Sequence, residues 1–317
     1  MAKKVALMTR HHATLICKEA RDILTQAGFE IVSNDTGRIL TFEEQKALIK
    51  DAYAIVAGTE KYDREMLLGC DNLKVVTRFG VGTDNFDLVT MKEMGLEVGV
   101  IANYNAVAEF ALTLILSVLK NLPRYDRAAR SGAWSRFEMR ELTGKTVGIV
   151  GFGRIGKRLA ELLSGFGVTI LAYDPFMNEQ AAAERKVTPA SLEELLAKSD
   201  IVSLHLPATE QTKHLINERT IAQMKQGAYL INTSRGSLVD EKALYTALTS
   251  GKLAGAALDV YEKEPITQDN PLFAIENTVY SPHCSALTFE TNYNGGIICA
   301  QSIVNVLNGE KPLYPLW

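Results

Sequence analysis

Residues 146–157 read TVGIVGFGRIGK, an apolar run that passes directly into a Gly-x-Gly-x-x-Gly pattern. A segment of helical periodicity, 155–166, continues from it. At such a junction of strand and helix, Gly151 permits the tight turn, and Gly153 lets backbone N–H groups approach a ligand. Gly156 lets the helix pack closely against the strand. These residues therefore predict one strand–turn–helix unit of a parallel α/β sheet.

The rest of the chain repeats this alternation of apolar runs and helical segments. The predicted strands are 5–8, 54–57, 75–77, 147–150, 169–173, 201–204 and 229–232, with two more at 255–258 and 277–280. The predicted helices are 15–27, 42–50, 106–119, 155–166, 192–197, 241–250 and, after an Asn- and Gly-rich segment at 291–300, one near 300–307. This alternation predicts βαβ units in parallel sheets that are covered by helices on both faces.

The composition is that of an ordinary globular protein. A length of 317 residues suggests two domains, and 47% hydrophobic with 22% charged residues excludes a disordered tail, a collagen or a coiled coil. The formal net charge of −3 offers no basic excess for binding nucleic acid. The longest apolar run, 110–119, is too short to span a bilayer, and the run at 5–8 ends too early for a signal peptide.

The spacing of the cysteines indicates a reducing compartment and no metal site. Cys17, Cys70, Cys284 and Cys299 form no Cys-x-x-Cys pair and no zinc-binding spacing. Scattered thiols in a chain of this size fit a reducing cytoplasm. We therefore expect no metal and no membrane partner.

The glycine pattern also predicts a dinucleotide site. The next strand ends in Asp174, which lies 174 − 156 = 18 residues after Gly156, close to the roughly 20 expected of a carboxylate that binds the adenosine ribose. The helix N-terminus would attract the phosphates. No Arg or Lys follows Asp174 before Arg185, which favours NAD over its 2′-phosphorylated form. A structural turn followed by a surface aspartate is the alternative.

A second glycine-containing stretch, 78–85, does not repeat the pattern, because Asn85 stands where the third glycine would be. We expect a turn here rather than a helix start. Its backbone N–H groups are suited to a ligand anion, and a plain β-turn is equally compatible with the spacing.

Three segments after predicted strands carry residues suited to proton and hydride transfer, namely Arg235, Glu264 and His283. Loops at the carboxyl ends of parallel strands share one edge of the sheet, where ligands bind. Histidine suits the base, because its ordinary pKa lies near working pH, and arginine suits a carboxylate. Each residue alone also has a structural explanation. Asp259 and Glu262 compete with Glu264 as the partner of His283, and spacing does not choose among them.

Taken together, these motifs resemble the D-isomer-specific 2-hydroxyacid dehydrogenases, and most of all the phosphoglycerate dehydrogenase branch. The resemblance covers about residues 54–308 and rests on 78–84, 106–109, 144–156, 173–175, 205–207, 233–236, 259–265 and 282–283. It implies an NAD-dependent oxidoreductase that transfers hydride between C2 of a 2-hydroxy acid and NAD. The substrate expected is 3-phosphoglycerate, with glycerate/hydroxypyruvate or D-lactate as alternatives. An NAD(H)-sensing, corepressor-like binding protein is the alternative of another class.

The resemblance also implies the domain organisation. We expect two Rossmann-like or flavodoxin-like domains with parallel sheets and NAD in the cleft between them. Residues 1–103 with 285–317 would form a discontinuous substrate (catalytic) domain, and residues 104–284 the NAD-binding Rossmann domain. A cytoplasmic homodimer is implied, and no serine-regulated domain is expected after the last helix.

The same resemblance assigns roles residue by residue. Arg235, Glu264 and His283 match the catalytic residues, with Arg235 on the substrate carboxylate and Glu264 with His283 as the proton relay. The implied cofactor contacts are Gly151, Gly153, Arg154, Ile155, Gly156, Asp174, Leu206, Pro207, Thr212, Thr233, Ser234, Arg235, Asp259, His283, Ser285 and Ala286. The implied substrate contacts are Arg78, Gly80, Val81, Gly82 and Arg235. After His283, the sequence Cys284-Ser285-Ala286 departs from the family pattern and changes the wall of the active site.

Overall fold

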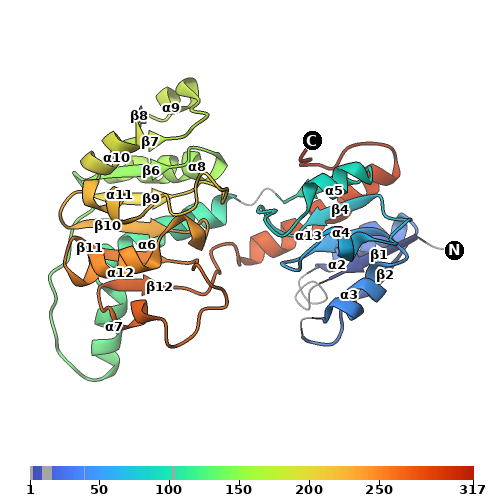
Figure 1. Ribbon diagram of the computed structural model, residues 1–317, viewed down its shortest axis with the longest axis horizontal. Helices are drawn as coiled ribbons and strands as arrows, with labels where there is room; N and C mark the ends of the chain where they lie inside the picture. Colours follow the sequence, from blue (N-terminus) through green and yellow to red (C-terminus); the bar gives the residue numbers. More distant parts are fainter. Residues whose placement is uncertain (1–2, 9–15, 39, 102–103) are drawn as a thin grey trace. The chain divides into compact units, whose positions relative to one another are not determined.

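The computed structural model describes residues 3–8, 16–38, 40–101 and 104–317. The chain divides into two compact units, Met1–Asn103 with Ala286–Trp317 (unit 1) and Tyr104–Ser285 (unit 2) (Figure 1). Each unit holds one sheet of parallel strands flanked by helices. This confirms the predicted α/β class with two parallel sheets.

Unit 1 contains a sheet of order β2-β1-β3-β4-β5. Its strands are β1 (Lys3–Leu7), β2 (Phe29–Ser33), β3 (Ala52–Ala57), β4 (Val75–Arg78) and β5 (Glu97–Val100). Helices α2 (Lys18–Gln26) and α13 (Phe289–Leu307) pack on one face. Helices α3 (Phe42–Ile49), α4 (Arg64–Leu67) and α5 (Leu88–Glu93) pack on the other. The central strands are therefore buried on both faces, as continuous apolar runs require.

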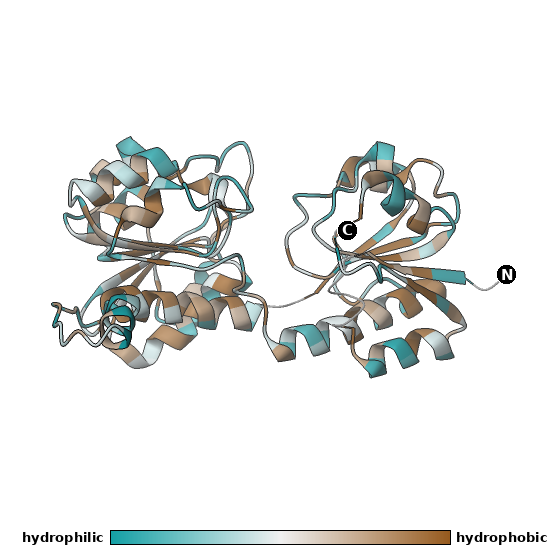
Figure 2. Ribbon diagram, turned by 90° about the horizontal axis from the view of Figure 1, so that it is seen from below, coloured by the Kyte–Doolittle hydropathy of each residue, from teal (hydrophilic) through white to brown (hydrophobic). Residues whose placement is uncertain are grey.

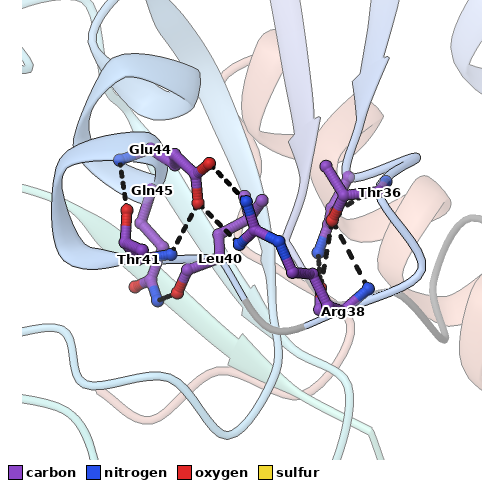
Figure 3. Close-up of polar contacts among 7 residues, drawn as sticks. Thr36, Arg38, Leu40, Thr41, Glu44 and Gln45 are labelled. Carbon is purple, nitrogen blue, oxygen red and sulfur yellow. Dashed lines mark hydrogen bonds and ion pairs between the residues drawn. The ribbon is translucent and has the colours of Figure 1, made fainter.

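Helix α3 begins where its sequence predicts, because its first turn is capped by side chains. Thr41 Oγ1 accepts the Glu44 N–H at 3.4 Å, and Glu44 Oε2 accepts the Thr41 N–H at 2.8 Å. Figure 3 shows this capping box and the Arg38 guanidinium, which donates to both oxygens of Glu44. The reciprocal bonds satisfy N–H groups that a helix start otherwise leaves unpaired.

Unit 2 contains a sheet of order β12-β11-β10-β9-β6-β7-β8. Its strands are β6 (Thr146–Val150), β7 (Thr169–Tyr173), β8 (Thr188–Pro189), β9 (Ile201–Leu204), β10 (Ala228–Asn232), β11 (Leu253–Leu258) and β12 (Thr278–Tyr280). Helices α6 (Tyr104–Leu119), α8 (Arg154–Leu163) and α9 (Glu179–Glu184) cover one face. Helices α10 (Leu192–Lys198), α11 (Glu218–Gln223) and α12 (Glu241–Thr249) cover the other. Helix α7 (Leu122–Arg130) follows α6.

Hydropathy follows this layering. The strands are mainly hydrophobic in Figure 2, and hydrophilic residues gather on outer helix faces and loops. Among the described helices, none alone is long and apolar enough to cross a bilayer. Helices α6 and α7 meet that criterion only as a pair, bent by 64°.

The observed elements differ from the predicted ones at several places. The last helix begins at Phe289, not near residue 300, because Thr288 caps it by accepting the Thr291 N–H and its small residues permit close packing. A Cβ on Gly295 would lie 3.0 Å from Ile101 Cδ1. Strands β2, β5 and β8 were not predicted; they are edge strands, and β2 and β5 mix polar and apolar residues. The helices α4, α5, α7, α9 and α11, each of nine residues or fewer, were not predicted either. Residue 15, the expected start of α2, lies outside the described residues.

Candidate active site

The predicted site residues of unit 2 lie on loops at one edge of its sheet or in the first turn of α8 (Arg154, Ile155 and Gly156). The strands β6, β7, β9, β10, β11 and β12 run parallel, so their carboxyl ends share that edge. The loops that follow them are 151–153, 174–178, 205–217, 233–240, 259–270 and, within unit 2, 281–285. In open α/β sheets this edge is where ligands bind.

The glycine loop has the geometry that its sequence predicts. Gly151 has a φ of +105°, and a Cβ there would come within 2.5 Å of the His205 carbonyl carbon. A Cβ on Gly156 would lie 2.1 Å from the Gly151 oxygen. Gly153 is the N-cap residue of α8 and brings no side-chain cap to the helix. The N-terminus of α8 is therefore built for close approach of an anion such as a pyrophosphate.

Asp174 is anchored to the glycine loop. Its Oδ2 accepts the Phe152 N–H at 2.7 Å, and its Oδ1 accepts the Phe176 N–H at 2.8 Å. Each carboxylate oxygen has a further lone pair, so both retain capacity for ribose hydroxyls. The carboxylate also adds negative charge, which opposes a 2′-phosphate at this position.

The loop after β10 is held by Asn232, a residue that was not among the predicted site residues. The Asn232 side chain, almost fully buried, accepts the Ser234 N–H at 3.0 Å and donates to the Arg235 oxygen at 2.8 Å. Ser234 Oγ donates to the Leu206 oxygen, which joins this loop to the loop after β9. A buried amide at a strand end just before Thr-Ser-Arg-Gly was the available signal.

Two further cofactor candidates differ in their hydrogen bonding. Thr233 Oγ1 is buried and has no hydrogen-bond partner among the described residues. Such an orphaned hydroxyl fits a site in which a bound ligand supplies the partner. Thr212 Oγ1 instead donates to the Pro207 oxygen at 2.7 Å and stabilises its own loop.

His283 and Glu264 form a hydrogen-bonded pair. His283 Nδ1 lies 2.7 Å from Glu264 Oε2, and the Tyr261 N–H donates to Glu264 Oε1 at 3.0 Å. Burial alone would raise the pKa of Glu264. The hydrogen bonds from His283 and Tyr261, together with the charge of Arg235, outweigh burial and hold that pKa below its ordinary value. Glu264 is therefore an ionised partner for the imidazole.

The structure separates the carboxylates that compete for His283. Asp259 is fully buried and accepts hydrogen bonds from Ser281 Oγ at 2.6 Å and from the N–H groups of Cys284 and Ser285 at 2.9 Å. It thereby fixes the loop that carries His283. Glu262 pairs with His214 instead.

Arg235 lies on the loop between these groups and the cofactor candidates. Its side chain is half-buried, and Nη1 donates to the Ser234 oxygen at 2.7 Å. Its positive charge acts on Glu264. Unit 2 thus brings a cation, a carboxylate and an imidazole to one sheet edge. No group of three metal-ligating side chains occurs in the ranges that the structure describes.

The remaining predicted residues belong to unit 1, on its own sheet edge. Gly80, Val81 and Gly82 form the turn after β4, and the Val81 side chain is 46% exposed. Arg78 Nε donates to the Gly82 oxygen at 3.0 Å, and its Nη1 donates to the Phe79 oxygen at 3.1 Å. The Arg78 guanidinium therefore supports this turn. Ala286 is the first residue of the returning segment.

Comparison with known proteins identifies the family. Residues 112–285 match the model described as "D-isomer specific 2-hydroxyacid dehydrogenase, NAD binding domain". The chain belongs to the D-isomer specific 2-hydroxyacid dehydrogenase family. The matched model also confirms NAD as the cofactor, which the glycine loop and Asp174 predicted.

Individual relatives of this dehydrogenase family carry different names. The chain is 37% identical to D-3-phosphoglycerate dehydrogenase of Archaeoglobus fulgidus, over 93% of this chain and 56% of that protein. It is 41% identical to glyoxylate reductase of Thermofilum pendens, over 85% of this chain and 83% of that protein. Among solved structures, TT0316 protein from Thermus thermophilus is similar with a TM-score of 0.90 and 30% identity, over 99% of this chain and 100% of that one. The chain spans about half the length of the curated phosphoglycerate dehydrogenases that it matches.

Proposed function

We propose that this protein is an NAD-dependent oxidoreductase that interconverts a small 2-hydroxy acid and its 2-oxo acid. The observation that carries the proposal is the His283–Glu264 pair on the sheet edge that also holds Arg235 and the glycine loop. Proton transfer, carboxylate binding and hydride exchange are the requirements of this reaction, and these residue types meet them.

In the proposed mechanism, His283 is the base. Because Nδ1 faces Glu264, Nε2 is the ring nitrogen left to take the hydroxyl proton of the substrate. Ionised Glu264 fixes the tautomer and stabilises the imidazolium that forms, as a carboxylate does beside other catalytic histidines. Arg235 binds the substrate carboxylate and orients C2.

NAD fits the residues of unit 2 that would hold it. The open N-terminus of α8 suits the pyrophosphate, Asp174 suits the ribose, and the orphaned Thr233 hydroxyl supplies a further contact. When bound, NAD supplies the acceptor for the hydride that leaves C2 of the acid.

Two substrate classes remain as candidates within this proposal. Relatives named D-3-phosphoglycerate dehydrogenase support 3-phosphoglycerate, the acid that the sequence resemblance favours. The Thermofilum pendens relative supports a short unphosphorylated acid, and the match covers 83% of that glyoxylate reductase against 56% of the first phosphoglycerate dehydrogenase.

We also propose a cytoplasmic homodimer. All four cysteines are free, which fits a reducing compartment. Residues 122–139 of unit 2 expose the apolar side chains of Leu122, Trp134 and Met139, and Trp134 is 89% exposed. Such a surface fits contact with a second copy. Sedimentation of the purified protein at the mass of one chain would contradict the dimer.

The test of the activity is NADH oxidation with a panel of 2-oxo acids, followed by the Arg235→Ala variant at saturating cofactor. We expect kcat/KM to fall by roughly 30-fold to several thousand-fold, because truncating one partner of a hydrogen-bonded charge pair costs roughly 2–5 kcal/mol. Arg219→Ala, on the exposed surface of α11, is the matched control and should retain wild-type turnover.

The outcomes separate the competing functions. Wild-type turnover in Arg235→Ala on every accepted acid would refute the mechanism. Tight NADH binding without turnover of any acid would instead indicate the NAD(H)-sensing protein.

A further inference from the structure

Tyr261 is a buried tyrosine of unit 2 whose side chain has no part in the proposed proton and hydride transfer. It lies in the loop after β11, three residues before Glu264. Its side chain is 5% exposed and belongs to the apolar core cluster that also contains Leu206, Leu238 and Leu272. A buried tyrosine has its ring fixed by packing while its hydroxyl takes a hydrogen-bond partner. The partners of Tyr261 therefore show what this residue holds in place.

The hydroxyl of Tyr261 contacts the segment that leads to His283. It donates to the Ser281 oxygen at 2.9 Å and to the Leu258 oxygen at 3.3 Å. Ser281 lies two residues before His283, and Leu258 is the last residue of β11. Burial raises the pKa of the Tyr261 hydroxyl well above its ordinary value, so the hydroxyl stays a neutral donor. It thus joins the loop of the histidine to the end of β11.

The backbone of Tyr261 holds the other member of the histidine–glutamate pair. The Tyr261 N–H donates to Glu264 Oε1 at 3.0 Å, while Glu264 Oε2 lies 2.7 Å from His283 Nδ1. The two carboxylate oxygens therefore have different partners, one for each of the two residues. Tyr261 fixes the glutamate directly and the histidine through the Ser281 carbonyl.

The same backbone contacts the loop that carries Arg235. A Cβ on Gly236 would overlap the carbonyl group of Tyr261 and would lie 2.5 Å from the Glu262 nitrogen. Gly236 directly follows Arg235, and the absence of a side chain there lets the two main chains touch. The spacing of Arg235 from the histidine–glutamate pair is thus set at Tyr261.

We infer that Tyr261 is a positioning residue that holds three segments of unit 2 in the spacing that the reaction requires. These segments carry Arg235, Glu264 and His283. A misplacement of about 1 Å can lower a catalytic rate by about 10²-fold, so the hydroxyl of Tyr261 contributes to turnover without touching the substrate. This inference rests on the proposed function, since it concerns the same reaction.

Tyr261→Phe is the test, because it keeps the buried ring and removes only the hydroxyl. We expect kcat to fall roughly tenfold, while the KM for the acid and the Kd for NADH stay within about twofold of wild type, since no ligand contact is lost. Tyr280→Phe is the matched control. The Tyr280 hydroxyl also donates to a backbone carbonyl, but to that of Leu272 in the 3₁₀ helix Pro271–Ala274, so this variant should retain the wild-type kcat.

Two further measurements separate positioning from a merely structural contribution. In a Glu264→Gln background, where the pair is already broken, Tyr261→Phe should lower kcat by less than about twofold more, because the two residues act as one unit. Deuterium exchange of the backbone N–H groups of residues 281–285 does not depend on turnover. It should become at least about threefold faster in Tyr261→Phe and stay unchanged in Tyr280→Phe.

The possible outcomes keep this inference distinct from the proposed function. With an active wild type, an unchanged kcat in Tyr261→Phe or an equal loss in Tyr280→Phe would overturn the inference. A full tenfold loss in the Glu264→Gln background, or unchanged exchange at 281–285, would overturn it as well. A wild type that reduces no 2-oxo acid would overturn the proposed function, and the inference would fall with it.

Discussion

Two histidine–glutamate pairs in unit 2 differ in the ring nitrogen that meets the carboxylate. His283 meets Glu264 through Nδ1, and His214 meets Glu262 through Nε2. Both histidines have left-handed backbones, with φ of 52° and 48°, and both side chains are about half exposed, at 48% and 40%. Exposure and backbone strain therefore do not distinguish a catalytic candidate from a structural pair.

The difference lies in what each pair leaves available. With Nδ1 on its carboxylate, His283 keeps its outer nitrogen for a substrate. In the other pair, His214 contacts its carboxylate through Nε2, so its outer nitrogen joins two loops and is not available to a substrate. Glu264 also accepts a hydrogen bond from the Tyr261 N–H, and the positive charge of Arg235 lowers its pKa. A histidine–carboxylate pair is thus suited to proton transfer only when the carboxylate holds the inner nitrogen.

The strongest test of this difference replaces each histidine by asparagine. Asparagine tolerates the left-handed backbone conformation of both positions. We expect His283→Asn to lower kcat roughly 10³-fold, within the range that general acid–base catalysis supplies. His214→Asn should stay within about threefold of wild type. Steady-state NADH assays on the accepted acid measure both. Equal losses in the two variants would show that the distinction between the pairs is wrong.

Replacing Glu264 tests the same difference at the carboxylate that holds His283. Glu264→Gln keeps the shape but removes the charge, so we expect kcat to fall roughly 10²-fold. In the oxidative direction a neutral imidazole must accept the proton. Because the lost carboxylate no longer stabilises the imidazolium that forms, the loss should fall on kcat rather than on KM. Steady-state NADH assays that return the wild-type kcat would contradict the role given to Glu264.

His205 extends the comparison to a histidine that pairs with a hydroxyl. Its Nε2 lies 2.9 Å from Ser203 Oγ, and its buried Nδ1 has no partner among the described residues. Burial lowers the pKa of His205 to about 4, from an ordinary value of 6.5. Between pH 6.5 and about 4 the unfolded chain therefore binds a proton that the folded chain excludes.

The free energy of unfolding should accordingly fall by up to about 3 kcal/mol as the pH drops through that window. His205→Asn should flatten this slope, which urea denaturation at a series of pH values measures. His214→Asn is the matched control, because it removes a half-exposed histidine. If the control flattens the slope as much as His205→Asn does, burial of His205 is not the cause.

The same residues show which features of the fold and the site could be predicted from the sequence. The glycine loop and Asp174 could be predicted because their roles depend on a single strand–turn–helix unit and on the end of the next strand. Continuous apolar runs likewise predicted the parallel sheets.

The choice among Asp259, Glu262 and Glu264 could not be made from spacing, because it depends on the path of the loop that carries them. That path buries Asp259 beneath the 281–285 loop and turns Glu262 toward His214, a residue 48 positions away. Asn232 was missed for the same reason, since its side chain acts on backbone atoms that only the folded loop brings within reach.

The smallest effect is expected for Glu262, whose replacement tests whether the His214–Glu262 pair has only a structural role. Its carboxylate meets His214, and its N–H donates to Glu241 Oε1 at 2.8 Å, so it links three segments around the loop that carries Glu264. Even a half-exposed ion pair is worth only roughly 0–1 kcal/mol, so loss of this hydrogen-bonded pair in Glu262→Gln should cost less than about 1 kcal/mol of stability and change kcat less than threefold. A double-mutant cycle with His214→Asn isolates the pair. A tenfold fall in kcat would instead mean that the second pair positions the first.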